Sequence, residues 1–159
     1  YFKSKETLIV RVFQETFGEL FLGLNHALTE DKSLFEQIEA IVKVYTTFLL
    51  KHPGLPLFLL TEMKRDQRAH FARIKKAGIQ PPLKAFFAKV IEAQQKGIIR
   101  SDIDPKNLIL DMISMLLFPV VAKPMVKFMH DLNEQDYKKM IRDREQHITQ
   151  LIINAVKAP

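Results

Sequence analysis

The side chains best placed to hold a metal ion or an amine are Glu62, Asp66 and His70, which follow one another at four-residue intervals. On a helix this spacing puts all three on one face. Two carboxylates and an imidazole so arranged can coordinate a divalent cation or bind a protonated amine. The alternative is a solvated helix face stabilised by neighbouring charges, which is the more common use of such a pattern. We therefore predict no metal site and no cofactor.

A second candidate is Asp111, a carboxylate inside the apolar segment Leu-Ile-Leu-Asp-Met-Ile of residues 108–113. A buried charge without a partner is costly. We therefore expect Asp111 to pair with another group, for which Arg144 and Lys123 are candidates, or to lie at the wet edge of an interface. A contact with a ligand is the alternative.

Catalytic motifs are missing from the sequence. There is no serine in a glycine elbow, no glycine-rich phosphate loop, no His-Glu-x-x-His and no cysteine. The lack of cysteine excludes disulfides and thiolate chemistry, and it fits a protein of the reducing cytoplasm. The sequence predicts that the protein is not an enzyme; an all-α enzyme with scattered acids is an alternative that would show turnover and metal dependence.

A basic segment lies between Lys64 and Lys76, where six cationic residues accompany one acid, Asp66. A basic helix face can bind nucleic acid or anionic lipid. The formal net charge of +6 is moderate, however, and no exposed aromatic pattern accompanies the segment. We interpret it as a solvated surface.

The elements that must position these groups are helices. Apolar residues recur at three- and four-residue steps throughout the 159 residues, and no segment alternates as a strand does. This pattern predicts an all-α bundle of six helices or more, with short connections. The expected helices begin near Ser4, Ser33, Pro56, Pro81, Asp104 and Asn133.

Local signals mark several of the helix ends. The segment Ser33–Glu36 is a capping box. Pro81 and Pro82 are expected in the first turn of the fourth helix, where a missing N–H has no cost. Pro119 and Pro124 should kink or end the fifth helix.

The fifth helix is apolar nearly all round, so it must be covered on both sides. One side can face its own domain and the other a second subunit, and the long apolar stripe of the last helix supports this. We therefore predict a homodimer; the alternative is the central helix of a monomeric bundle. The apolar run 108–122 is too short to cross a membrane, which takes roughly 20 residues. The expected interface residues are Ile109, Met112, Ile113, Leu116, Leu117, Ile148, Leu151, Ile152 and Ala155.

The N-terminal octapeptide Tyr-Phe-Lys-Ser-Lys-Glu-Thr-Leu sets aromatic and basic residues at the start of a long helix. A helix N-terminus with lysines suits phosphate. The octapeptide resembles the end of the helix-turn-helix domain in the tetracycline-repressor (TetR/AcrR) family, where Tyr-Phe-Lys-Ser-Lys-Glu-x-Leu closes the recognition helix. The resemblance extends through the segments 97–105, 116–119 and 155–159 and through the order of the helices.

This resemblance implies a cytoplasmic, ligand-responsive transcriptional regulator, a dimeric repressor that releases palindromic operator DNA when an effector binds. Residues 1–5 would be a remnant of the DNA-binding domain, whose three short helices would precede Tyr1, and residues 6–159 the ligand-binding and dimerisation domain. Tyr1, Lys3 and Lys5 are carried over as DNA-phosphate contacts. The alternative is a helical ligand-binding or protein-interaction module without a DNA function.

The chain contains twelve phenylalanines and six methionines. Ligand pockets are mostly apolar and often lie between the helices of a bundle. With the family resemblance, this predicts a pocket for a small apolar or aromatic effector; the alternative is that these residues are ordinary core. The expected lining is Phe17, Phe21, Phe48, Phe58, Met63, Phe86 and Phe87.

Overall fold

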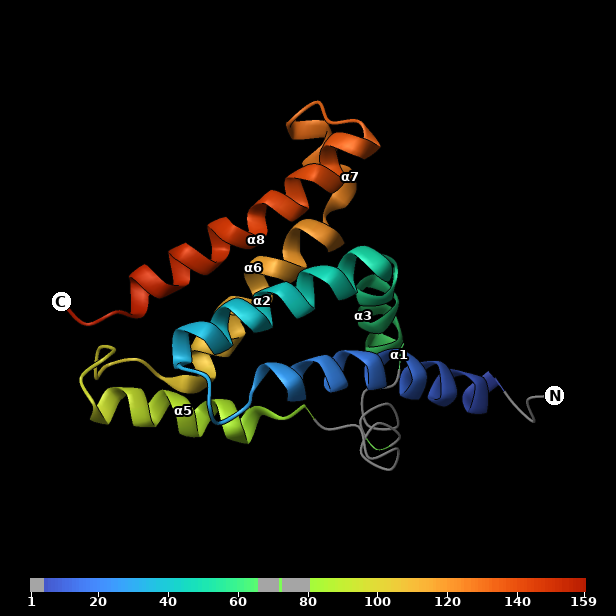
Figure 1. Cartoon of the computed structure of the whole chain (residues 1–159). Coiled ribbons are helices and arrows are strands. Elements are labelled where there is room, and N and C mark those ends of the chain that lie inside the picture. Colours follow the sequence, from blue (N-terminus) through green and yellow to red (C-terminus); the bar gives the residue numbers. More distant parts are fainter. Residues whose placement is uncertain (1–4, 66–71, 73–80) are drawn as a thin grey trace.

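The computed structural model describes residues 5–65, 72 and 81–159, and this part of the chain forms seven α-helices (Figure 1). Within these residues no strand is present, and the single extended pairing is an isolated bridge between Ile99 and Lys157. The predicted all-α fold is confirmed. The helices are α1 (Lys5–Ala27), α2 (Leu34–Lys51), α3 (Leu55–Arg65), α5 (Leu83–Gln95), α6 (Pro105–Val121), α7 (Lys123–Met129) and α8 (Glu134–Val156).

Helix α2 is the centre of the domain. It packs against α1, α5, α6 and α8, and in Figure 1 it lies between α1 below and α8 above. Its inner face carries Ile38, Ile41 and Val42, which are fully buried. The predicted capping box begins this helix: the Ser33 hydroxyl accepts from the Glu36 N–H at 3.3 Å, and the Glu36 carboxylate accepts from the Ser33 N–H at 2.8 Å. A local signal thus sets the start of the most buried helix.

The boundaries of α5 differ from the prediction at one end. Pro82 is the N-cap with a non-helical ψ of 48°, so both prolines precede the helix and the prediction that they occupy its first turn is wrong. A proline restricts the residue before it, so Pro82 keeps Pro81 out of the helical region. At the other end Gly97 has a φ of +66°, the left-handed conformation that stops a helix and that only glycine adopts readily.

Pro119 lies inside α6, which ends two residues later at Val121, before Pro124. The chain then turns by 75° into α7, so the predicted kink or end of the fifth helix in this region is confirmed. Because proline has no N–H, the carbonyl of Met115, four residues earlier, loses its helical donor. A side chain of α8 replaces that donor: Arg144 Nη2 donates to the Met115 oxygen at 3.3 Å. The Tyr137 hydroxyl donates to the carbonyl of Pro119 at 3.1 Å, so α8 stabilises α6 on both sides of the proline.

Helix α7 was not predicted as a separate element. Pro124 lies in its first turn, where the missing N–H is harmless. The axes of α6 and α7 meet at 75°, so the chain turns sharply before α8. No single helix of the described residues is long and apolar enough to cross a membrane, although the bent pair α6 and α7 passes that test on length and composition together.

The end of α8 is fastened to the loop that leads into α6. Arg100 N–H donates to the carbonyl of Val156 at 2.9 Å, and its guanidinium Nη1 donates to Ala155 O at 3.1 Å. The same loop is held from α5, because Gln94 Nε2 donates to the carbonyl of Ile103 at 2.8 Å and to that of Ser101 at 3.2 Å. These bonds orient α6 and α8 as an antiparallel pair whose outer face forms one surface.

Candidate functional site

An aromatic cluster joins α1 to the C-terminal half of α2. The ring of Phe17 lies 5.8 Å from that of Phe21 and 6.0 Å from that of Phe48. The cluster continues to the end of α2, where the His52 ring lies 5.1 Å from Phe48. Phe48 is buried, whereas Phe17 and Phe21 are half-buried. Three of the expected pocket residues are therefore neighbours, on the two helices that face one another.

The other expected pocket residues have different surroundings. Phe86 is 0% exposed in the core, and Phe87 packs against the edge of that core. Phe58 is 39% exposed on α3, away from this core cluster. Met63 belongs to α3, but its side chain lies outside the described residues. The expected pocket residues therefore do not form one site. Phe86 and Phe87 belong to the core and its edge, and Phe58 lies at the surface; Phe17, Phe21 and Phe48 form the cluster between α1 and α2.

A polar group that sequence reasoning missed lies beside this cluster. Glu19 of α1 accepts from Lys51 Nζ at 2.6 Å, and its other oxygen lies 3.6 Å from His52 Nε2. The hydrogen bond from Lys51, together with the charge of Lys51, lowers the pKa of Glu19 against an opposing effect of desolvation. Thirty-two residues separate Glu19 from Lys51, so spacing along one helix could not reveal the pair. The pair connects α1 to the end of α2.

Glu19→Gln is expected to reduce thermal stability at neutral pH and to have less effect in acid. Because the folded-state pKa of Glu19 lies below its ordinary value of 4.5, its contribution is present above that value and is lost as the pH falls through the lowered pKa. The measurement is the melting temperature at about pH 7 and about pH 3. Glu39→Gln, at an exposed position of α2, is the matched control. A deficit of equal size at both pH values would contradict this role.

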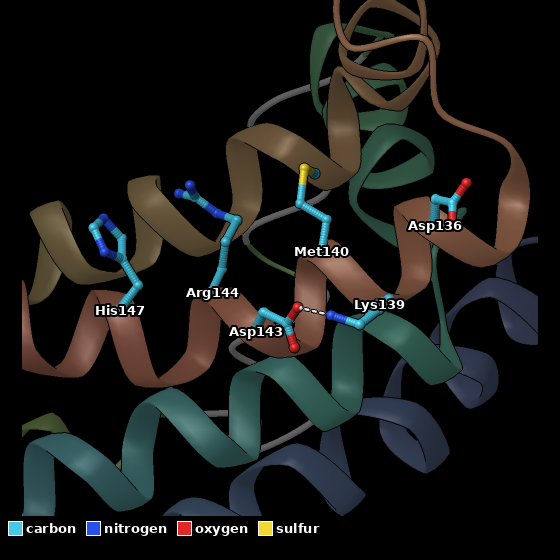
Figure 2. A pocket seen from close by; sticks show the side chains of 6 residues that line it. All are labelled: Asp136, Lys139, Met140, Asp143, Arg144 and His147. Atoms are coloured by element: carbon cyan, nitrogen blue, oxygen red, sulfur yellow. Dashed lines mark hydrogen bonds and ion pairs between the residues drawn. The ribbon is translucent and has the colours of Figure 1, made fainter.

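The outer face of α6 and α8 contains three hollows, two of which are the largest among the described residues. One, of about 570 Å³, lies between the two helices, and its apolar floor includes Met115, Leu151 and Ile152. A neighbouring hollow of about 450 Å³ extends the surface toward α7 past Phe118. Figure 2 shows a third, of about 340 Å³, along α8; there Arg144 projects toward α6, away from the ion pair of Lys139 and Asp143.

The expected dimer residues are divided between this face and the protomer's own core. Ile113 and Leu117 are half-buried, and Leu151 and Ala155 are exposed. The remaining five are at most 7% exposed and pack mainly inside the protomer, although Ile152 also lines the 570 Å³ hollow: Ile109, Met112, Leu116, Ile148 and Ile152. We therefore revise the proposed interface toward the exposed side of the two helices.

Two large exposed residues of that side were missed. Leu110 and Phe118 are each 60% exposed on α6. With Ser114 they form a row at four-residue spacing, which could have been recognised as a third face of the helix. An apolar row that a protomer leaves open is characteristic of an interaction surface.

Polar groups on the same face do not pair as expected. Asp111 is exposed and has no hydrogen-bond or ion-pair partner among the described residues, so its predicted pairing is not observed. Lys123 instead pairs with Glu134 at 2.6 Å, and Arg144 binds the carbonyl of Met115. The exposure of Asp111 fits the alternative, a position at an interface edge.

Several predicted groups lie outside the described residues. These are Tyr1, Lys3, Asp66, His70 and the side chains of Glu62 and Lys5, together with most of the basic segment. The backbone of Lys5 begins α1. Among the described residues, no three histidine or carboxylate side chains are grouped as a metal site requires.

The fold and these surfaces define an all-α domain with a long leading helix, an aromatic cluster beneath it and an open apolar face on its last helices. The family model described as "Tetracyclin repressor-like, C-terminal domain" matches residues 35–152, and the chain belongs to this family. The match extends from α2 into the last turns of α8 and confirms the resemblance drawn from the sequence. A search of curated proteins found no match.

Proposed function

We propose that this chain is the regulatory domain of a dimeric transcriptional repressor that releases palindromic operator DNA when a small apolar or aromatic effector binds. The observation that carries the proposal is the family match over residues 35–152, since members of the family bind DNA, bind effectors and dimerise. The aromatic cluster and the open face of α6 and α8 supply surfaces for the last two of these activities.

The effector site we propose lies against Phe17, Phe21 and Phe48. Apolar and aromatic walls with a few polar groups are typical of ligand sites, and Glu19 and His52 provide polar groups at the edge of this cluster. Phe86 supports the site from the core and does not line it.

The proposed signal travels along α1. This helix has 23 residues and is therefore about 35 Å long. An effector that separates the Phe17 ring from Phe48 would tilt α1 against α2, and the displacement would be largest at the Lys5 end, next to the expected DNA-binding head. The effector must bind the tilted arrangement more tightly than the DNA-bound one, because otherwise it shifts no population.

Dimer symmetry makes this movement effective. Two subunits related by a two-fold axis hold their heads at a fixed spacing, which matches the half-sites of a palindrome. A change in that spacing weakens both half-site contacts together.

The experiment that tests the proposal uses the full-length gene product. It is titrated against DNA from upstream of its own gene at two salt concentrations, with random DNA as competitor. We expect competitor-resistant, salt-sensitive binding that a small apolar effector reverses. Binding no stronger than to random DNA at either salt would favour a ligand-binding module without a DNA function.

In the same assay, Lys5→Ala is expected to weaken binding to all DNA sequences and to reduce the salt slope by about one. The reason is that a lysine on a phosphate supplies affinity without reading bases. Lys106→Ala, at an exposed position near the start of α6, is the control and should leave both quantities unchanged. An unchanged salt slope in Lys5→Ala would remove Lys5 from the phosphate contacts.

A further inference from the structure

Arg144 is held in place with much of its hydrogen-bonding capacity unused. Because Pro119 leaves the Met115 carbonyl without a helical donor, Arg144 Nη2 binds that oxygen at 3.3 Å, which places the guanidinium on α6. The Nε atom is buried and has no hydrogen-bond partner among the described residues. A guanidinium has five N–H donors, and a buried donor without an acceptor is destabilising.

A carboxylate without a partner lies one helical turn away. Asp111 precedes Met115 by four residues on α6, and both residues line the 570 Å³ hollow. The other two acids of that hollow are engaged, since Asp102 pairs with Arg100 at 2.6 Å and Asp104 caps α6. Among the acids that line this hollow, the unpaired one is therefore Asp111.

The two cations of α8 drawn in Figure 2 do not pair with Asp111 within one protomer. In Figure 2 the ammonium group of Lys139 is bound to Asp143, and Arg144 projects from α8 on the side of α6. Within one protomer Arg144 stays at the level of Met115 and makes no ion pair with Asp111 among the contacts of the described residues.

We propose, on the basis of the dimer described above, that Asp111 of each protomer pairs with the partner subunit's Arg144. In a two-fold interface every contact occurs twice, so one dimer would contain two such pairs. Arg144 lies at the level of Met115, so the two-fold axis of the dimer must pass between the levels of Asp111 and Met115 on α6, beside Ser114. Ser114 lines both neighbouring hollows, and its small side chain lets the two α6 helices approach closely.

The surroundings favour a strong pair. Leu110, Phe118 and Leu151 are each about half-exposed or more on this face. When a second copy covers them, water is excluded around the charges, and the attraction between carboxylate and guanidinium increases. The same pair supplies an acceptor for the unused donors of Arg144, and it gives the apolar surface a specific register.

The test is complementation between two charge-reversed chains, Asp111→Lys and Arg144→Glu, made in the full-length protein with tags of different mass. Alone, each variant would oppose like charges twice in its homodimer, so its dissociation constant should rise about hundredfold. When the two are mixed, the new lysine faces the new glutamate, and the native Asp111 faces the native Arg144. The mixed dimer should therefore form preferentially, within about tenfold of the wild-type affinity. Native mass spectrometry reads the three species directly.

Each outcome decides between explanations. A preferred mixed dimer supports the cross-subunit pair. Random mixing, or two folded variants that stay monomeric together, overturns it while leaving the dimer itself in place. A wild-type protein that is monomeric at micromolar concentration overturns the proposed dimer instead.

A second pair of variants covers the case in which Arg144→Glu fails to fold. Asp111→Asn mixed with Arg144→Gln keeps one native pair and removes both charges of the other, so the mixed dimer should again exceed both homodimers. Asp143→Asn is the matched control, because this exposed acid pairs with Lys139 on its own helix. Its dimer affinity should change by less than about twofold.

Discussion

Replacing Phe86 by alanine is expected to destabilise the domain by about 3–5 kcal/mol, a large part of the total stability of an ordinary domain. Phe86 is 0% exposed and lies on the inner face of α5 beside Val90, which is equally buried. Removing the ring leaves a cavity that close-packed neighbours fill only in part. The measurement is the free energy of unfolding from urea denaturation.

Phe58→Ala is the matched control for that prediction. Phe58 is 39% exposed on α3, so its loss should cost about 1 kcal/mol or less. The pair also separates the two interpretations of the aromatic residues. If Phe86→Ala kept nearly full stability and instead altered effector binding, Phe86 would be a wall of the effector site and our assignment of it to the core would fail.

Introducing glutamate at both Leu110 and Phe118 is expected to weaken the dimer by about hundredfold or more. Each side chain is 60% exposed in the protomer, so the change should leave the fold intact. In a dimer, four carboxylates would be buried in an apolar contact without partners, which is strongly unfavourable. Sedimentation equilibrium over a range of concentrations measures the effect, and circular dichroism checks the fold.

Leu22→Glu provides the control for the dimer, because Leu22 is 61% exposed on α1, away from the surface of α6 and α8. It should change the dissociation constant by less than about threefold. An unchanged dimer in the double variant would place the subunit contact elsewhere on the domain.

The helices could be predicted because their signals are local. The Ser33 capping box, the Asp104 cap before Pro105 and the left-handed Gly97 each act within one turn of the chain. Pro119 and Pro124 likewise mark the region in which α6 ends and the chain turns. What they leave open is the donor for the Met115 carbonyl, which Pro119 cannot supply and which Arg144 of α8, far away in sequence, provides.

The candidate sites could be predicted only in part, because periodicity identifies an apolar face without identifying what covers it. Phe17, Phe48 and Phe86 each belong to the apolar stripe of a helix. Phe86 is nevertheless fully buried in the core, whereas Phe17 is half-buried beside Phe48. Likewise Met112 and Leu110 belong to one apolar helix, but the protomer buries the first and exposes the second.

By itself, then, the amino-acid sequence determined the all-α class, most helix starts and stops, and the resemblance to the tetracycline-repressor family, since these depend on neighbouring residues and short motifs. The tertiary structure decided which apolar faces remain open and which polar groups meet. Glu19 reaches Lys51 and Arg144 reaches Met115 only because α1, α2, α6 and α8 pack as they do. The physical reason is that burial and pairing depend on the contacts of whole helices, which no window of the sequence contains.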